Sequence, residues 1–326
     1  MPEHKIGWLN IPGYTPVTWN PITGCTPASE GCAHCYAKRM AQRLAGRYGY
    51  PKDEPFRPGT VHLDKLSEPL HWRKQRAVFV CSMGDLFHED VAFSAIDRVV
   101  GTMAQCPQHI FMLLTKRPLR MEAYISDLQS VEGALRFENQ LSYPMRLHKA
   151  AMAFRRGEFL PNAWLGVTVE NQDQDWRVRE LLRIPAAVRF ASVEPCLSFV
   201  NVERYAPTYS CHDCGYVGND IGAETDPEVD EVKCPRCGTS EDGAFGFANC
   251  DETPRLDWLI AGGESGPGAR PMDPEWVRSL RDQCVAAGTP YFFKSWGKHV
   301  PKDQTQHTLD GETWRQWPTE GGTPCA

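Results

Sequence analysis

Residues 76–118 read RAVFVCSMGDLFHEDVAFSAIDRVVGTMAQCPQHIFMLLTKRP, and this stretch indicates the fold class. Near its two ends lie short apolar runs, Val78–Ser82 and Ile110–Leu114, which are typical of buried strands. Between them, four apolar residues recur at the spacing of one helix face: Ile96, Val99, Val100 and Met103. A strand, a helix and a second strand in this order predict parallel pairing, with the helix on one face of the sheet.

The same alternation continues along the rest of the chain. Five further strands are predicted: Val17–Ile22, Leu165–Val169, Val188–Val193, Trp258–Ala261 and Tyr291–Phe293. Helices are predicted over about 34–44, within 127–162, and after Asp273, where Pro274 suits a first helical turn. Six or seven such units predict an α/β fold, a partial or complete parallel (β/α) barrel.

Composition and charge exclude several classes of protein. The chain has 326 residues, with 35 basic and 41 acidic side chains, a net charge of −6. Bulk charge therefore does not favour binding to nucleic acid or to an anionic membrane. No apolar run approaches the roughly 20 residues of a membrane helix, and the first residues do not resemble a signal peptide. We expect a cytoplasmic protein with no membrane partner and with reduced cysteines.

Four of the 13 cysteines have the spacing C-x2-C-x19-C-x2-C: Cys211, Cys214, Cys234 and Cys237. This spacing predicts a four-cysteine zinc ribbon that binds Zn²⁺, with an auxiliary iron–sulfur cluster or a redox pair as alternatives. Residues 201–254 carry twelve acidic and three basic side chains, a net of −9. So acidic a ribbon is not suited to a phosphate backbone. We expect it to brace the fold, meet a partner protein or cap the site.

The predicted domain organisation follows from these patterns. Residues 1–200 and 255–300 form the barrel, 201–254 form an acidic zinc-ribbon insertion, and 301–326 form a C-terminal extension.

A second cysteine cluster, Cys25, Cys32 and Cys35, has the spacing C-x6-C-x2-C and follows the first predicted strand. Three thiolates can hold three irons of a cubane iron–sulfur cluster and leave the fourth iron open. They can equally hold zinc with His34 or a distant cysteine as a fourth ligand, and a plain turn is a third interpretation. Spacing alone does not decide between these.

Polar residues follow each predicted strand, where the chemistry of β/α barrels lies. The candidates are Ser82, Asp85, Lys116, Arg117, Glu170, Asn171, Glu194, Gly262, Gly263, Glu264 and Lys294. Taken singly, each is explained as a solvated or capping residue. The segment AGGESGPGARP, residues 261–271, is the most specific of these, because its glycines let backbone N–H groups approach an anionic or carboxylate ligand. A plain turn is the alternative there.

The cysteine triplet after the first strand of a β/α barrel resembles the radical S-adenosylmethionine superfamily. Cys32-Ala33-His34-Cys35 matches the second half of the superfamily motif, whereas the first gap is six residues rather than three. More closely, the chain resembles a phage-associated three-Cys-motif family of unknown function. The matching stretches are TWNPITGCTPASEGCAHCYA, VFVCSMGDLFHEDV, LLTKRP, WLGVTVEN, FASVEPCL, DWLIAGGESGPGARP and FFKSWG.

The resemblance implies a mechanism. Cys25, Cys32 and Cys35 would hold a 4Fe–4S cluster whose fourth iron takes the amino and carboxylate groups of S-adenosylmethionine. An electron from a donor such as flavodoxin or ferredoxin would then give a 5′-deoxyadenosyl radical, which abstracts hydrogen from a substrate. A nucleotide or nucleic acid is the favoured substrate, with a peptide as the alternative.

The same resemblance implies roles for the strand-end residues. Ser82 and Asp85 would contact the methionine end of the cofactor. Glu170 or Asn171 would contact the ribose, and Glu194 the ribose or the substrate. The adenosine or substrate side is assigned to Gly262, Gly263 and Glu264. A substrate anion is assigned to Lys116, Arg117 and Lys294.

Two other functions remain open at this point. In the first, both cysteine clusters are structural in a zinc-stabilised binding protein without redox chemistry. In the second, His88, Glu89 and Glu264 supply acid–base groups to a hydrolase or transferase, although no nucleophile motif supports it. A basic face is also foreseen as a nucleic-acid contact, with a solvated surface as the favoured interpretation: Lys38, Arg39, Arg43, Arg47, Arg155 and Arg156.

Overall fold

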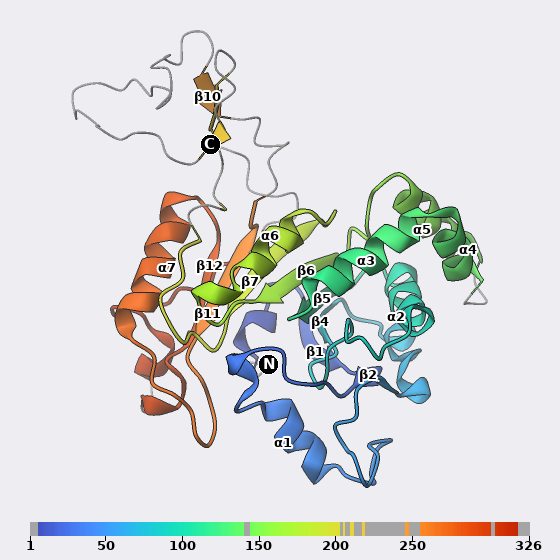
Figure 1. Ribbon diagram of the computed structural model, residues 1–326, viewed down its shortest axis with the longest axis horizontal. Coiled ribbons are helices and arrows are strands. Elements are labelled where there is room, and N and C mark those ends of the chain that lie inside the picture. Colours follow the sequence, from blue (N-terminus) through green and yellow to red (C-terminus); the bar gives the residue numbers. More distant parts are fainter. Residues whose placement is uncertain are drawn as a thin grey trace.

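A parallel sheet of seven strands, curled into a half-barrel with helices outside, forms the body of the protein (Figure 1). The computed structural model describes residues 6–139, 144–202, 205, 209–211, 217–218, 245–247, 255–300 and 304–318. The strand order is β1-β4-β5-β6-β7-β11-β12, so the chain adds each strand beside the previous one. This is the partial form of the predicted barrel, and β1 and β12 are its two edges.

The strands of the half-barrel are β1 (Thr15–Trp19), β4 (Arg76–Val80), β5 (Ile110–Thr115), β6 (Ala163–Thr168), β7 (Val188–Val193), β11 (Trp258–Gly262) and β12 (Tyr291–Ser295). The α-helices are α1 (Tyr36–Arg43), α2 (Phe93–Gln105), α3 (Pro118–Gln129), α4 (Val131–Glu138), α5 (Pro144–Arg155), α6 (Trp176–Leu182) and α7 (Pro274–Ala286). A short hairpin pairs β2 (Ile22–Thr23) with β3 (Thr60–Val61). The strands of the half-barrel and the helices α1, α2, α4, α5 and α7 agree in type with the sequence pattern, with boundaries that shift by a few residues. The helices α3 and α6 and the β2–β3 hairpin were not predicted.

The first predicted strand, Val17–Ile22, was wrong at its end. β1 stops at Trp19, and Ile22 pairs antiparallel with Val61 instead. The Oδ1 atom of Asn20 accepts hydrogen bonds from the Met83 backbone N–H at 2.9 Å and from the Ser82 hydroxyl at 3.1 Å. These side-chain hydrogen bonds of Asn20 take the place of the backbone hydrogen bonds between β1 and β4 at this point. Pro21 has no N–H with which the strand could continue.

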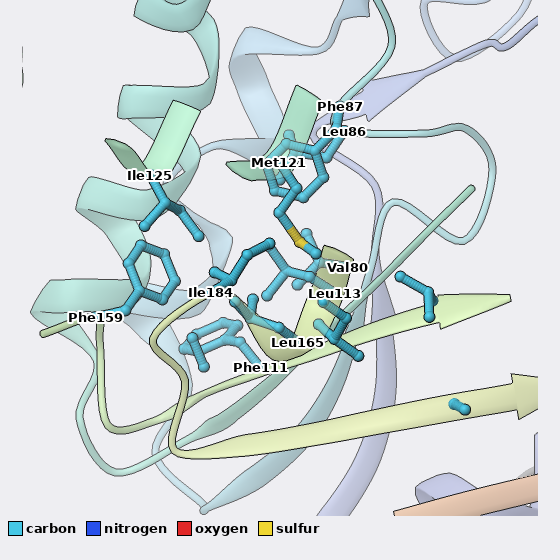
Figure 2. Close-up of a cluster of buried hydrophobic side chains, with 14 of the residues drawn as sticks. Val80, Leu86, Phe87, Phe111, Leu113, Met121, Ile125, Phe159, Leu165 and Ile184 are labelled. Atoms are coloured by element: carbon cyan, nitrogen blue, oxygen red, sulfur yellow. The ribbon is translucent and has the colours of Figure 1, made fainter. Parts of the chain in front are cut away.

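The outer face of the sheet packs against the helices. Because successive side chains of a strand point to opposite faces, Phe111 and Leu113 of β5 and Leu165 of β6 face outward together. Figure 2 shows them against Met121 and Ile125 of α3, in a fully buried cluster. This face supplies most of the apolar burial that holds the half-barrel together.

The inner, concave face is filled by aromatic rings at one end. Trp8, from the N-terminal 3-10 helix Gly7–Leu9, lies among inward side chains of three strands. Its ring centroid is 5.0 Å from that of Phe79, 6.4 Å from Phe190 and 6.3 Å from Trp258. The ring therefore plugs the interior that a complete barrel would fill with its own strands.

Residues 304–318 close the same end of the half-barrel. The indole N–H of Trp317 donates to the Trp8 carbonyl at 2.9 Å, and that of Trp258 donates to the Gln316 carbonyl at 2.8 Å. Leu309 is fully buried, and Arg315 pairs antiparallel with Phe292 of β12. This part of the C-terminal extension packs on the edge of the sheet.

The insertion between β7 and β11 contributes a three-stranded antiparallel sheet of β8 (Tyr209–Cys211), β9 (Val217–Gly218) and β10 (Phe245–Phe247). Cys214, Cys234 and Cys237 lie outside the described residues, and so does the side chain of Cys211. The zinc ribbon therefore stays a prediction. Within the described part of the chain, no helix is long and apolar enough to cross a membrane.

Substitution of Gly166 tests the packing of the inner face. Gly166 of β6 pairs with Phe190 of β7, and a Cβ atom at Gly166 would lie 2.3 Å from the Phe190 ring. We expect Gly166→Ala to lower the free energy of unfolding by about 1–3 kcal/mol through this overlap. Urea denaturation measures it. In a Phe190→Leu background the same change should cost less, and an equal cost in both backgrounds would contradict the overlap.

Candidate functional site

A cavity of about 390 Å³ lies on the concave side, at the carboxyl ends of the strands. Its floor is apolar and consists of Trp8 and Phe79 of the aromatic plug, together with Leu114. Its walls carry polar residues from six successive strands or the loops after them: Ser82, Asp85, Thr115, Lys116, Thr168, Ser192, Glu194, Gly263, Glu264 and Lys294. The curl of the sheet thus gathers residues that are far apart in the sequence.

The three cysteines of the C-x6-C-x2-C motif all line this cavity. Cys25 follows the hairpin strand β2, Cys32 ends the short 3-10 turn Glu30–Cys32, and Cys35 immediately precedes α1. Two sulfurs accept hydrogen bonds, Cys25 Sγ from Arg117 at 3.4 Å and Cys32 Sγ from the Ala28 backbone N–H at 3.4 Å. One loop therefore presents three thiols to one cavity.

Burial, together with the negative charge of Asp85, raises the pKa of the Cys25 thiol to about 12, although the guanidinium of Arg117 opposes both. At neutral pH the thiol without a bound metal is therefore protonated. Metal binding would have to displace that proton, as it does at other thiolate sites.

Arg117, directly after β5, ties the cysteine loop to two other strand ends. Its side chain donates to Asp85 at 3.2 Å, to Glu89 at 2.9 Å, and to the Thr26 carbonyl at 3.1 Å. The hydroxyl of Thr26 in turn lies within hydrogen-bond distance of His88, at 2.8 Å. Loops after β2, β4 and β5 are thereby joined around Cys25.

Asp85 serves the same network. Its carboxylate accepts from the Phe87 backbone N–H at 3.0 Å, from the Thr115 hydroxyl at 2.7 Å and from the Lys116 backbone N–H at 3.3 Å, in addition to Arg117. With both oxygens engaged, Asp85 acts in this geometry as a positioning residue for the loops.

Glu170, just after β6, is a fully buried carboxylate that anchors the other side of the cysteine loop. It accepts from the Ser29 hydroxyl at 2.6 Å and from Arg177 at 2.9 Å, and it forms an ion pair with Lys116. Burial opposes its charge, but Lys116 and Arg177 outweigh burial and hold its pKa below the ordinary value. A Cβ atom at Gly31 would lie 2.4 Å from Glu170, so the loop passes directly over this carboxylate.

A cluster of four residues links the cysteine loop to the glycine-rich loop after β11. Glu264 accepts from Arg270 Nη2 at 2.9 Å and from His34 Nδ1 at 3.1 Å, and Arg270 also contacts Glu30 at 3.1 Å. Because β1 and β12 are the edges of the half-barrel and β11 lies beside β12, this cluster bridges the open side of the sheet. We call these four residues the clasp.

Burial opposes the charge of Glu264, but hydrogen bonds from the side chain and backbone of Arg270 and from His34 outweigh it and lower the pKa to about 2. Glu264 is thus an anion at every physiological pH. Lys294 of the neighbouring strand β12 forms an ion pair with Glu194, after β7. The cavity wall therefore carries both positive and negative side chains.

The structure places the predicted site residues in two groups. Ser82, Asp85, Lys116, Glu194, Gly263, Glu264 and Lys294 line the cavity with the three cysteines. The others do not line it: Arg117, Glu170, Asn171 and Gly262.

Asn171 donates to Glu30 at 3.4 Å, and Gly262 accepts the backbone N–H of Cys196 at 2.9 Å. The roles assigned to all these residues stay predictions.

Sequence reasoning missed several residues of the site. Thr168 and Ser192 are buried polar side chains inside apolar strands, and their period-2 position could have marked them as facing the interior. Arg270 lies within the glycine-rich segment, and its charge there is the one signal that could have marked it. No sequence signal places Trp8 under the cavity, because its contacts come from β4, β7 and β11.

The chemistry of the donor set fits an iron–sulfur cluster held by this loop. Among the described residues, no three His, Cys, Asp or Glu side chains approach closely enough to hold one metal ion. A cubane makes a different demand, because each thiolate binds its own iron. Three thiols from one loop that line one cavity, two of which accept N–H···S hydrogen bonds, are the groups that such a cluster uses.

The curled parallel sheet, with three thiols and a cavity at the carboxyl ends of its strands, defines an α/β half-barrel protein with a cysteine-lined cavity. Residues 9–318 match the family model described as "Protein of unknown function (DUF5131)", and the chain belongs to that family. No curated protein and no solved structure matches it. The expectation that nearly the whole chain belongs to a family of unknown function is confirmed. The name of this family differs from that of the phage-associated family expected from the sequence. Membership of the radical S-adenosylmethionine superfamily stays a prediction.

The clasp generates a pH-dependent prediction. We expect Glu264→Gln to lower the free energy of unfolding at pH 7 by about 1–3 kcal/mol, because Arg270 loses a charged partner that is only 7% exposed. The contribution of Glu264 is present above its ordinary pKa of 4.5 and is lost as the pH falls toward about 2. Urea denaturation at pH 7, 5 and 3 should show a gap between the two proteins that is narrower at pH 3 than at pH 7.

The matched control is Glu54→Gln, which removes an exposed carboxylate outside the clasp. It should leave stability unchanged at all three pH values. A gap between wild type and Glu264→Gln that stays constant down to pH 3 would contradict the assignment.

Proposed function

We propose that this protein is a radical S-adenosylmethionine enzyme in which Cys25, Cys32 and Cys35 hold a 4Fe–4S cluster. The observation that carries the proposal is the placement of these three thiols on one loop, in the wall of a cavity at the carboxyl ends of parallel strands. When bound, the cluster and S-adenosylmethionine supply radical-based hydrogen abstraction from a substrate. The substrate class we favour is a nucleotide or nucleic acid.

The residues around the loop support this role by holding the thiols in place. Arg117 fastens the Cys25 end to β4 and β5, Ser29 fastens the middle to Glu170, and Arg270 fastens Glu30 to Glu264. Each anchor is a charged or charge-assisted contact, and these are the stronger hydrogen bonds in proteins. The thiols are therefore positioned before any metal arrives, which reduces the ordering that binding requires.

Charges in the cavity suit a ligand with both an amino and a carboxylate group. Glu194 and Glu264 offer acceptors for an ammonium group, and Lys116 and Lys294 offer positive charge for a carboxylate. The apolar floor of Trp8, Phe79 and Leu114 keeps water from the deep end of the cavity. A reactive radical needs such a dry pocket to avoid side reactions.

Metal analysis tests the proposal directly. Protein purified and reconstituted without oxygen should contain about four irons and four sulfides per chain and should absorb near 400 nm. A Cys32→Ala/Cys35→Ala variant should lose this iron. Removal of Cys106, which is buried against the helices and does not line the cavity, should leave the iron unchanged.

The alternative is a zinc-stabilised binding protein without redox chemistry. The same metal analysis distinguishes this protein from the radical enzyme. Two zincs per chain and no iron under these conditions would overturn the radical proposal. Four irons that persist in the double cysteine variant would overturn the assignment of the ligands. Cleavage of S-adenosylmethionine by the reduced, iron-loaded protein is the assay that then follows.

Arg117 gives a prediction with an electrochemical readout. Its positive charge and its hydrogen bond to Cys25 Sγ favour the more negative, reduced state of any cluster bound there. Loss of one such bond is worth about 1 kcal/mol, which for a one-electron couple is about 40 mV. We expect Arg117→Gln to lower the midpoint potential by at least this amount at unchanged iron content, as measured by a redox titration.

Arg120→Gln is the control, because Arg120 lies on α3 three residues after Arg117 but contacts the Val91 carbonyl and the Phe93 ring instead of a cysteine. It should leave the potential unchanged. Equal potentials in all three proteins would show that Arg117 does not act on the cluster.

A further inference from the structure

One face of α1 leads outward from the cavity. Tyr36, Met40 and Arg43 recur at positions i, i+4 and i+7, and Arg47 and Tyr48 follow just beyond the helix. Tyr36 is 52%, Met40 41% and Tyr48 75% exposed, and both arginines are exposed too. We call these five residues the α1 track. The opposite face of α1, with Ala37 and Ala41, is buried and fixes this orientation.

The outer end of the α1 track is held rigidly. The Tyr50 backbone N–H donates to the Arg47 carbonyl at 2.9 Å, and the Gly46 N–H donates to the Tyr50 carbonyl at 3.0 Å. The Tyr50 ring is buried and lies 5.4 Å from that of His62. Tyr48 has a φ of +50°, a conformation that a bulky residue seldom adopts. The turn thus holds the backbone at Tyr48 and leaves its ring exposed to solvent.

The sequence segment that contains the α1 track is strongly positive. Residues 36–76 carry ten basic and four acidic side chains, a net of +6 in a chain whose net charge is −6. Within the described part of the chain, Arg43 and Arg47 form no ion pair. Three exposed arginines elsewhere do form them: Arg156 with Glu158, Arg183 with Glu180, and Arg278 with Glu275 and Asp310.

The basic face foreseen from the sequence is divided by the fold. Arg155 ends α5, which lies well away from α1 (Figure 1), and Arg156 is paired with Glu158. Arg39 is half-buried and donates to the Pro267 carbonyl at 3.2 Å. Among the described residues, Arg43 and Arg47 of these six therefore remain as unpaired positive charge along the α1 track, with Lys38 on another side of the helix.

Tyr36 connects the α1 track to the cavity. Its ring lines the cavity beside Cys35, and its hydroxyl donates to the Ser82 backbone carbonyl. A ligand that lies along Arg47, Arg43 and Met40 therefore reaches the cavity at Tyr36.

We propose that the α1 track binds single-stranded nucleic acid and delivers one unpaired base to the cavity. Arginines that follow the backbone, combined with exposed aromatic rings on which bases stack, are the groups that bind single strands without sequence preference. A duplex hides its base faces and would leave Tyr48 and Met40 without a partner. The chemistry performed on that base rests on the proposed function, whereas the binding itself requires no cluster.

The test is fluorescence anisotropy of the full-length protein with a labelled 12-nucleotide oligothymidylate between 25 and 200 mM salt. We expect affinity to fall as salt rises. Arg43→Gln/Arg47→Gln should reduce the slope of log K against log salt by about 1.4, because each phosphate contact to a single strand contributes about 0.7. The charge-matched control is Arg156→Gln/Arg183→Gln, which should keep the slope of the wild type.

Tyr48→Ala supplies a second, uncharged readout. Loss of one stacked base should weaken binding at least about fivefold at every salt concentration. Salt-independent binding, an equal loss in the control variant, or equal affinity for the corresponding duplex would overturn the proposal. Tight, salt-dependent binding by protein that takes up no iron would uphold the surface and overturn the radical chemistry instead, so the two failures are distinguishable.

Discussion

The buried carboxylate of Glu170 is the constraint on which the site depends. A fully buried negative charge is tolerated only where positive charge and hydrogen bonds surround it. Glu170 obtains them from Lys116 after β5, from Arg177 on α6, and from Ser29 of the cysteine loop. To satisfy this one group, the fold must bring a strand end, a helix and the loop together.

The consequence for the loop is geometric. Gly31 can pass over Glu170 because it has no side chain, and Cys32 follows at once in the wall of the cavity. Arg117 at one end and the clasp at the other complete three anchors on a single loop. Exposed ion pairs contribute little to folding stability. The charged contacts at these three anchors are largely sheltered from water and hydrogen-bonded, so they fix the position of the loop more than they stabilise the fold.

An incomplete barrel leaves a gap that this chain closes with other material. Trp8 and Trp317 fill one end of the concave face, where aromatic rings from β4, β7 and β11 meet them. The clasp bridges the other end, between loops that belong to opposite sides of the sheet. The cavity is what remains between plug and clasp, and it is there that the curled sheet concentrates its polar side chains.

The periodicity of the sequence was sufficient for the strands of the half-barrel and for most of its helices, though not for α3 and α6, because buried strands of a parallel sheet are short apolar runs separated by amphipathic helices. It failed at the end of β1, where hydrogen bonds of the Asn20 side chain replace the backbone hydrogen bonds to the neighbouring strand, so that the strand ends early. It also could not identify Trp8 or Arg270 as parts of the site. Trp8 packs against Trp258, and Arg270 contacts Glu30 of the cysteine loop. Each of these pairs is more than 200 positions apart in the sequence.

By itself, the sequence determined the class of fold, the two cysteine spacings and the collection of polar strand ends, because these are properties of local pattern. Only the tertiary structure decided which of those polar residues face one another. Glu170 and Asp85 follow strands as regularly as Glu194 does, yet the first is buried as an anchor and the second is engaged in holding loops. The reason is physical: a buried charge is placed by the partners that the whole fold brings to it, and those partners are not neighbours in the chain.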